Sequence, residues 1–150
     1  LGDVYKRQQE ELGEIIELCI PEITITNECL NLVSGTIRCN ARSAVKRAKE
    51  IMLYCGAKEI DVFGAKHFKE LSDMVGILPY GITHTEKQIL LALHTCGSST
   101  LTGLAAKIGM SKSALQRDHE LYLLNRNLME IDGKRKITHH GVNVCKTLSL

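Results

Sequence analysis

The feature that most constrains the fold of this chain is a pair of short helices in its second half, between residues 102 and 125. Thr102 is the expected N-cap of the first helix, and Gly109 ends it. Ser111 is the expected N-cap of the second helix, which runs to about Asn125. Small residues let two such helices cross closely, and glycine lets the chain turn the corner. The spacing therefore predicts a helix-turn-helix motif.

A tight hairpin follows this motif. Residues 128–131 and 136–138 are expected to form two strands around Asp132-Gly133, a dipeptide that favours tight hairpin turns. A last helix is expected over residues 139–148. A helix-turn-helix followed by a hairpin is the pattern of a winged helix. We therefore predict a mainly α fold that ends in a winged helix-turn-helix domain with a small β-hairpin wing.

A capping box marks the beginning of this domain. Thr83 and Glu86 have the spacing of a reciprocal cap, which opens a helix that runs through Thr95. The preceding segment, residues 76–81, contains Pro-Tyr-Gly and is the expected hinge. We assign residues 81–150 to the winged-helix domain.

Residues 9–80 are expected to form four helices joined by short extended links, because apolar residues recur there at three- and four-residue spacing. Thr26 is the expected N-cap of the second helix. The third helix organises this part of the chain, with its beginning at Gly35-Thr36 and its end at Gly56. The helices are expected at residues 9–19, 27–33, 34–55 and 62–74, and Asp61 is the expected N-cap of the fourth. The third helix is expected to bury one face, which comprises Ala41, Ala44, Val45, Ala48, Ile51, Met52 and Cys55.

A stripe of cations lies on another face of the third helix. It comprises Arg38, Arg42, Lys46 and Lys49, again at helical spacing. A solvated basic face is the ordinary interpretation of such a stripe. Arg38 differs from the others because we expect it in the first turn, where the helix dipole disfavours a cation unless an anion lies nearby.

The sequence around this stripe resembles a known family. Gly35-Thr36-x-Arg38, followed by Arg42 and a basic amphipathic helix, resembles the second sensor motif in the lid subdomain of AAA+ ATPases. From about Gln9 onward the chain is similar to the C-terminal part of the RuvB family, whose members drive branch migration of Holliday junctions. Tyr122-Leu123-Leu124 with Asn127-Leu128 resembles the winged helix of that family.

The resemblance implies a four-helix lid subdomain over residues 9–80 and a DNA-binding winged helix over residues 81–150. It implies that Arg38 reaches the phosphates of ATP bound to a neighbouring core subdomain, with Arg42 as support. It also implies that the intact protein uses ATP and Mg²⁺, forms a homo-hexamer, and acts on duplex and Holliday junction DNA with a RuvA-like junction-binding partner. No GxxxxGK[ST] loop is present, so we expect this chain alone to bind no cofactor and to have no complete catalytic site.

The expected DNA contacts are cations of the winged helix. Lys112 and Arg117 lie on the second motif helix, and Lys134, Arg135 and Lys136 lie in the wing. Three consecutive cations on an exposed hairpin favour phosphate contact, which in this family serves the DNA backbone rather than base readout. The alternative is that tip charges serve only solubility, because many winged helices make protein–protein contacts.

Charge is unevenly distributed along the chain, although its net charge is +2. Residues 9–80 carry eight Lys/Arg and eleven Asp/Glu, whereas residues 81–150 carry nine and five. This asymmetry weakly favours a nucleic-acid contact in the second half. No apolar run is long enough to span a membrane and no signal peptide is visible, so a cytoplasmic protein is expected.

Cysteine and histidine do not point to a metal or catalytic site. Four of the six cysteines fall within apolar helical patterns, where free Cys behaves as a small hydrophobe. There is no Cys-x-x-Cys, and the histidines are scattered without a mechanistically suggestive partner. The four cysteines within apolar helical patterns are Cys19, Cys29, Cys39 and Cys55.

Residues 1–8 are expected to be foreign to the protein. Asp-Val-Tyr-Lys-Arg-Gln is similar to a translated sequencing adapter, and the chain does not begin with Met. We therefore expect an N-terminally truncated fragment of a longer protein.

Two other functions remain open from the sequence. The first is a winged-helix transcription regulator with a helical partner-binding domain, although Lys112-Ser113-Ala114 is poor in base-reading residues. The second is the tail of another AAA+ protein, such as a replication initiator or a clamp loader. A sharp DNA consensus would favour the regulator.

Overall fold

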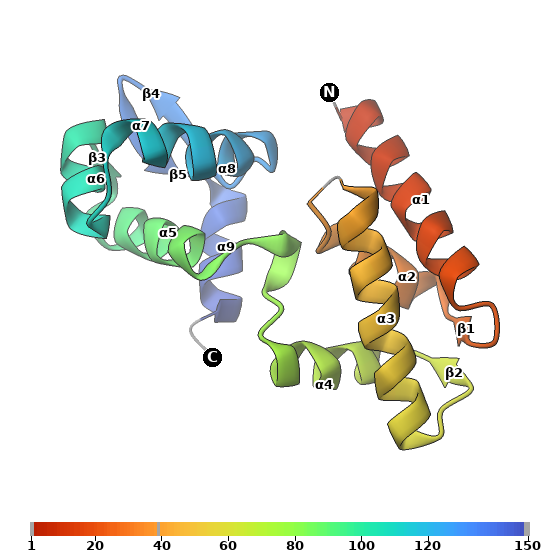
Figure 1. The fold of residues 1–150 in the computed structure, drawn as a ribbon. Coiled ribbons are helices and arrows are strands. Elements are labelled where there is room, and N and C mark those ends of the chain that lie inside the picture. The colour runs from red at the N-terminus through yellow and green to blue at the C-terminus, as the bar shows by residue number, and fades with distance from the viewer. Residues whose placement is uncertain (1, 39, 149–150) are drawn as a thin grey trace. The chain divides into compact units, whose positions relative to one another are not determined.

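The computed structural model describes residues 2–38 and 40–148, and it is mainly helical (Figure 1). The chain divides into two compact units, the first ending at Gly81 and the second beginning at Ile82. Each has its own small sheet and is described by itself below.

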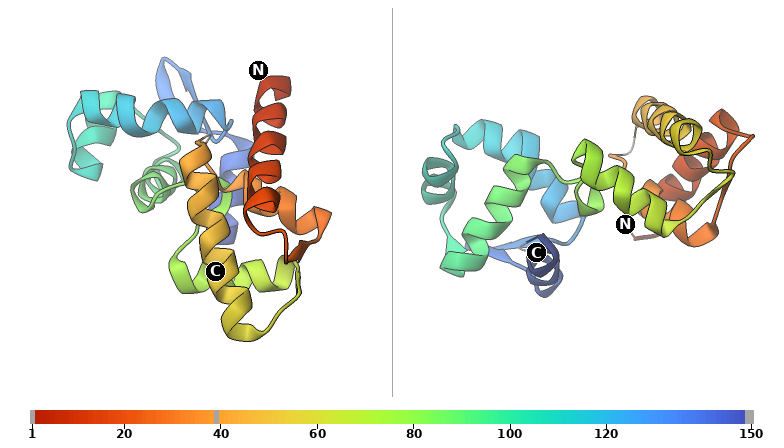
Figure 2. Two further views of the ribbon diagram at one scale, coloured as in Figure 1. Left: turned by 45° about the vertical axis from the view of Figure 1, so that its right-hand side comes forward. Right: turned by 90° about the horizontal axis from the view of Figure 1, so that it is seen from below.

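The first unit is a group of helices braced by one short strand pair. Helices α1 and α3 lie side by side in Figure 1 and Figure 2, and α1 also packs on α2. Their contact faces supply fully buried side chains such as Ile16, Val33 and Ile51. The elements are α1 (Gly2–Cys19), β1 (Thr24–Ile25), α2 (Asn27–Gly35), α3 (Ala41–Lys58), β2 (Val62–Phe63), α4 (Ala65–Val75) and the 3₁₀ turn η1 (Pro79–Gly81).

The beginning of α3 differs from the prediction. Helix α2 continues through Gly35, and the Thr36 hydroxyl donates to the Val33 carbonyl at 2.7 Å instead of capping a new helix. Asn40 is the N-cap of α3, because its side chain accepts from the Arg42 amide at 2.8 Å. The connection between α2 and α3 is therefore longer than predicted.

The end of α3 also differs. Gly56 lies within the helix, which continues to Lys58, and Glu59 adopts the left-handed conformation at the C-cap (φ 55°, ψ 50°). Glycine is the usual residue at this position because it has no Cβ, so the sequence pattern pointed to Gly56.

The fourth helix begins later than predicted, at Ala65, because the preceding residues belong to a strand pair that the sequence did not reveal. Thr24-Ile25 pairs in parallel with Val62-Phe63, so residues 62 and 63 are extended rather than helical. Asp61 precedes this strand, and Gly64 is the N-cap of α4. In contrast, the predicted Thr26 cap is confirmed, with the Cys29 amide donating to its hydroxyl oxygen at 3.3 Å.

The second unit is a winged helix, as predicted. Its sheet has the order β3-β5-β4, with both pairs antiparallel. Helices α7 and α8 flank a π-helical segment and form one continuous rod with it (Figure 1). The elements are α5 (His84–Cys96), β3 (Ser98–Ser99), α6 (Leu101–Ile108), α7 (Lys112–Leu115), the π segment η2 (Gln116–Glu120), α8 (Leu121–Asn125), β4 (Met129–Asp132), β5 (Lys134–Ile137) and α9 (His139–Leu148).

Local capping explains most boundaries in this unit. The Thr83–Glu86 capping box is confirmed by both hydrogen bonds, at 3.1 and 3.0 Å. Ser111 caps α7 as predicted. The cap of α6 is Thr100 rather than Thr102, because the Thr100 hydroxyl accepts from the Gly103 amide. The predicted wing is confirmed, although its second strand begins two residues earlier, at Lys134.

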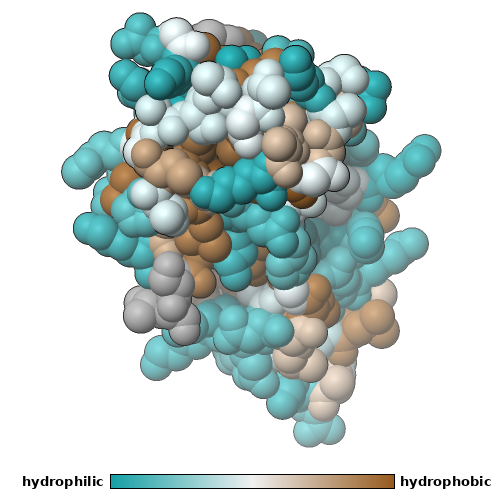
Figure 3. All heavy atoms as spheres, turned by 90° about the vertical axis from the view of Figure 1, so that its left-hand side faces the viewer, coloured by the Kyte–Doolittle hydropathy of each residue, from teal (hydrophilic) through white to brown (hydrophobic). Residues whose placement is uncertain are grey.

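The buried side chains are almost all apolar, and hydrophilic side chains cover much of the face drawn in Figure 3. Three predictions of buried residues are wrong. Ala41 is exposed at the beginning of α3, Cys19 is exposed at the end of α1, and Met52 is 44% exposed on α3. Cys29 and Cys55 are buried free thiols, as expected, and Cys39 lies outside the described residues.

Candidate nucleic-acid interface and nucleotide sensor

The second motif helix presents two of the predicted DNA contacts to solvent. Lys112 is exposed in the first turn of α7. The side chain of Arg117 is 74% exposed, and its Nε donates to the adjacent Asp118 at 2.8 Å. This hydrogen bond raises the pKa of Arg117 and lowers the pKa of Asp118. Lys112 is therefore the less compensated of the two cations.

Arg135 does not occupy the exposed position that we predicted for it. Its guanidinium donates from Nε and NH2 to the two carboxylate oxygens of Glu120, at 3.0 and 3.1 Å. The two side chains are only 14% and 7% exposed. Arg135 therefore joins the wing to the π segment, instead of standing at the tip with its neighbours.

Acidic residues oppose the two wing lysines. Glu130 lies directly opposite Lys136 in the antiparallel register, and Asp132 lies opposite Lys134. Lys134 is exposed, and the Lys136 side chain is 42% exposed with its Nζ 3.8 Å from Asp132. Opposite charges that face each other across strands attract, so this face of the wing is nearly balanced in charge.

A second buried contact joins the π segment to helix α5. The Glu86 side chain is fully buried, and its Oε2 lies 2.8 Å from His119 Nδ1. The other oxygen, Oε1, accepts from the Thr83 amide in the capping box. The consecutive residues His119 and Glu120 thus reach two different elements, α5 and β5. π segments are often found at functional positions in helices.

The sequence offered a partial signal for these two pairs. Glu120 lies three residues before the buried Leu123, so helical geometry places both on one face, where an acid needs a partner. Glu86 was identified only as a capping residue. Neither partner could be found from spacing, because His119 and Arg135 are distant in sequence from Glu86 and Glu120.

Arg38 lies in the connection before α3, not in the first helical turn as we predicted. It is half-buried, and its NH1 donates to the Gly81 carbonyl at 3.2 Å. Arg38 thus contacts the last residue of the first unit. Arg42 instead is the cation that the helix dipole disfavours, because it is exposed in the first turn of α3.

The rest of the stripe on α3 is mostly solvated. Lys46 and Lys49 are exposed, as the ordinary interpretation holds. Arg47 lies on the same helix outside the stripe. It pairs with Glu50 at 3.2 Å, and burial lowers its pKa.

Within residues 2–38 and 40–148, no group of three or more His, Cys, Asp or Glu side chains could hold a metal ion. None of the helices in this part of the chain is long and apolar enough to cross a membrane.

Comparison with solved structures shows what this arrangement resembles. The Holliday junction branch migration motor RuvB of Thermotoga maritima matches with a TM-score of 0.75 at 20% identity. Two variants of that protein give TM-scores of 0.76 and 0.74 at the same identity. The fold is similar to part of RuvB. In each case the match covers 92% of this chain and 48% of the RuvB chain, so the chain spans about half the length of these proteins. No protein-family model and no curated protein sequence matches.

Proposed function

We propose that this chain is the lid and winged-helix half of a RuvB-like branch migration motor. The observation that carries the proposal is a single structural match that covers 92% of the chain and so extends over both units. In such a protein the missing half would supply the ATPase core, and ATP and Mg²⁺ would bind there. The intact motor would be a cytoplasmic homo-hexamer that works with a RuvA-like partner on Holliday junctions during recombination and repair.

The winged helix would bind duplex DNA through exposed cations. Lys112 and Arg117 on the motif helix, and Lys134 and Lys136 in the wing, are accessible to phosphate. Arg135 would act indirectly, because its guanidinium holds the wing against Glu120. A nearly charge-balanced wing favours weak contact that depends on salt, which suits a motor that must act on any sequence.

Arg38 would act as the nucleotide sensor, with Arg42 as support. In the structure its NH1 donates to the neutral carbonyl of Gly81. A hydrogen bond between guanidinium and phosphate is charge-assisted and roughly twice as strong as a neutral one. Arg38 would therefore exchange the carbonyl for a phosphate brought by the core subdomain. Because Gly81 is where the first unit ends, this exchange would alter the segment that leads to the winged helix.

A binding selection on random duplexes tests this proposal against a transcription regulator. If the chain is half of a motor, the selection should recover duplexes that share no consensus sequence. A sharp consensus, bound orders of magnitude more tightly than scrambled DNA, would establish the regulator instead. The isolated chain should also hydrolyse no ATP, because one arginine cannot replace a phosphate-binding loop.

A further inference from the structure

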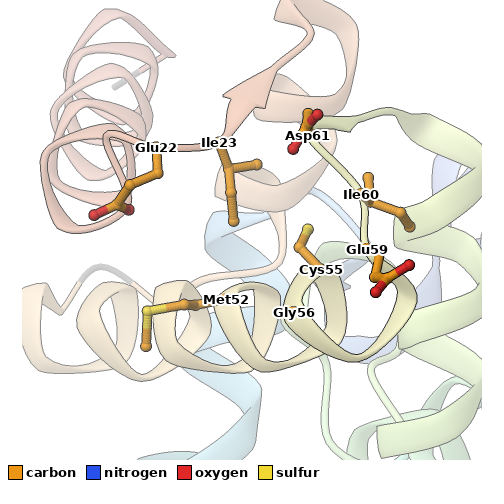
Figure 4. A pocket seen from close by; sticks show the side chains of 8 residues that line it. All are labelled: Glu22, Ile23, Met52, Cys55, Gly56, Glu59, Ile60 and Asp61. Atoms are coloured by element: carbon orange, nitrogen blue, oxygen red, sulfur yellow. The ribbon is translucent and has the colours of Figure 1, made fainter.

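A groove in the first unit has no part in the proposed DNA or nucleotide contacts. It has a volume of about 640 Å³ and lies between the link after α1, the last turns of α3 and the link after α3. Figure 4 shows Ile23 and Cys55 pointing toward each other across this space. Met52 and Ile60 also line it, so its floor is apolar.

Three carboxylates surround this apolar floor. Glu22, Glu59 and Asp61 are all exposed, and none of them forms an ion pair with any residue among 2–38 and 40–148. The nearby Lys58 does not neutralise them, because its Nζ turns to Glu70 at 3.3 Å. The rim is therefore strongly acidic, whereas the other cations of α3 lie toward the opposite end of that helix.

Glu59 is a destabilising residue at its position in the fold. It adopts the left-handed conformation, which costs a residue with a Cβ roughly 1 kcal/mol. It also places a negative charge at the C-terminus of α3, where the helix dipole favours a cation. Glycine would relieve both penalties. The acid at this position thus adds to the rim charge at a cost to the stability of the fold.

We propose that this groove docks a basic segment of a partner protein, with an apolar side chain seated on the floor and flanking Lys or Arg side chains on the rim. Charge complementarity selects this occupant, because an apolar surface within three unpaired carboxylates disfavours acidic and neutral partners. Met52 suits such a surface, since its flexible thioether adapts to different apolar anchors. The proposal does not depend on DNA or nucleotide binding.

Gly56 provides a steric test that keeps the charge unchanged. It lines the groove, and a Cβ added there would meet nothing within 4 Å. Gly56→Leu would therefore place a side chain in the groove without disturbing the core, and leucine is a better helix former than glycine. The matched control is Glu28→Lys, which reverses an exposed acid in the first turn of α2.

The experiment is a selection of displayed random 12-residue peptides on the 150-residue chain, followed by titration of the recovered peptides. The expected peptides carry an apolar anchor between Lys or Arg residues. Glu59→Lys/Asp61→Lys and Gly56→Leu should each weaken their binding at least tenfold, whereas Glu28→Lys should change it less than twofold. Thermal melts confirm that each variant is folded.

Several outcomes would overturn the proposal. One is the recovery of no basic peptides, and another is equal binding to the wild-type chain and the Gly56→Leu variant, which would indicate charge attraction alone. A third is self-association of the chain that Glu59→Lys/Asp61→Lys disperses, which would make a second copy the occupant.

Discussion

Arg135 and Glu120 form a two-pronged ion pair that ties the wing to the motif helix of the second unit. Both nitrogen–oxygen distances are close to 3 Å, and both side chains are largely buried. The central cation of the Lys-Arg-Lys run is thus a structural residue, because strand alternation turns it away from its two neighbours. Of the three cations, only the two lysines are open to solvent.

Removing Arg135 should destabilise the second unit. Arg135→Ala leaves the Glu120 carboxylate buried without its partner, and losing one member of such a pair costs about 3 kcal/mol. Lys134→Ala, at an exposed position of the same strand, should cost less than about 0.5 kcal/mol. Urea unfolding of both variants measures the difference. Equal free energies of unfolding would show that the pair contributes nothing.

Gly141 should tolerate no side chain, whereas Gly56 should. A Cβ at Gly141 would overlap the Leu128 carbonyl oxygen and the Ile137 side chain, because α9 lies directly against the wing. Gly141→Ala should therefore destabilise the protein by about 1–3 kcal/mol. Gly56→Ala has open space within a helix and should stabilise it by about 0.5–1 kcal/mol. The thermal denaturation midpoints of the two variants should shift in opposite directions from that of the wild type. Shifts in the same direction would contradict the packing described.

The first unit should lose stability in alkali through Cys29. Burial, followed by the nearby Cys55 and Glu28, raises the pKa of the Cys29 thiol to about 12. The folded state therefore holds this proton more strongly than the unfolded state, where the thiol titrates near pH 9. The stabilisation is complete below pH 9 and is lost as the pH rises through about 12.

Cys29→Ala provides the measurement. At pH 8 the variant should be less stable than the wild type by about 1 kcal/mol, because a buried sulfur is lost. At pH 10.5 the difference in the free energy of unfolding between the two proteins should be smaller, because only the wild type loses the thiol contribution. A gap that stays constant between the two pH values would contradict the role assigned to Cys29.

The sequence predicted those features that depend on neighbouring residues. The caps at Thr26, Thr83 and Ser111 were found because each side chain bonds an amide three residues along the chain. The same logic failed for α6, where Thr102 was the expected cap but the Thr100 hydroxyl accepts from the Gly103 amide. The failure shows that a capping residue type does not reveal which of two nearby threonines serves as the cap.

Features that depend on distant residues could not be predicted. The parallel pairing of β1 with β2 made residues 62 and 63 extended, and no local pattern indicated it. The partner of Arg135 was hidden for the same reason, so the exposed site predicted in the wing lost its central cation. At Glu59 the chain violates the local preference for glycine, and the groove that this residue borders was missed altogether.

Arg38 should matter more to ATP turnover than the other cations of the stripe. In a protein that joins this chain to a RuvB-type ATPase core, Arg38→Ala should lower turnover far more than Arg42→Ala or Lys46→Ala. Charge-assisted bonds to phosphate contribute roughly 1.5–3 kcal/mol, which corresponds to at least about a tenfold loss. Because Arg38 also contacts Gly81, the unfolding of each variant must be measured in parallel. Equal losses at all three positions would show that the stripe is only a solvated face.

The most direct test of the central claim is a salt titration of duplex binding. Two labelled 20-base-pair duplexes of unrelated sequence are titrated with the 150-residue chain, with Lys134→Ala/Lys136→Ala, and with Lys69→Ala as a control in the first unit. The two duplexes should give equal Kd values. The magnitude of the logarithmic salt slope should decrease by roughly 0.9 for each wing lysine removed and stay unchanged in the control. A preference of orders of magnitude for one duplex, or no binding at low salt, would contradict the claim that this winged helix binds duplex DNA without regard to sequence.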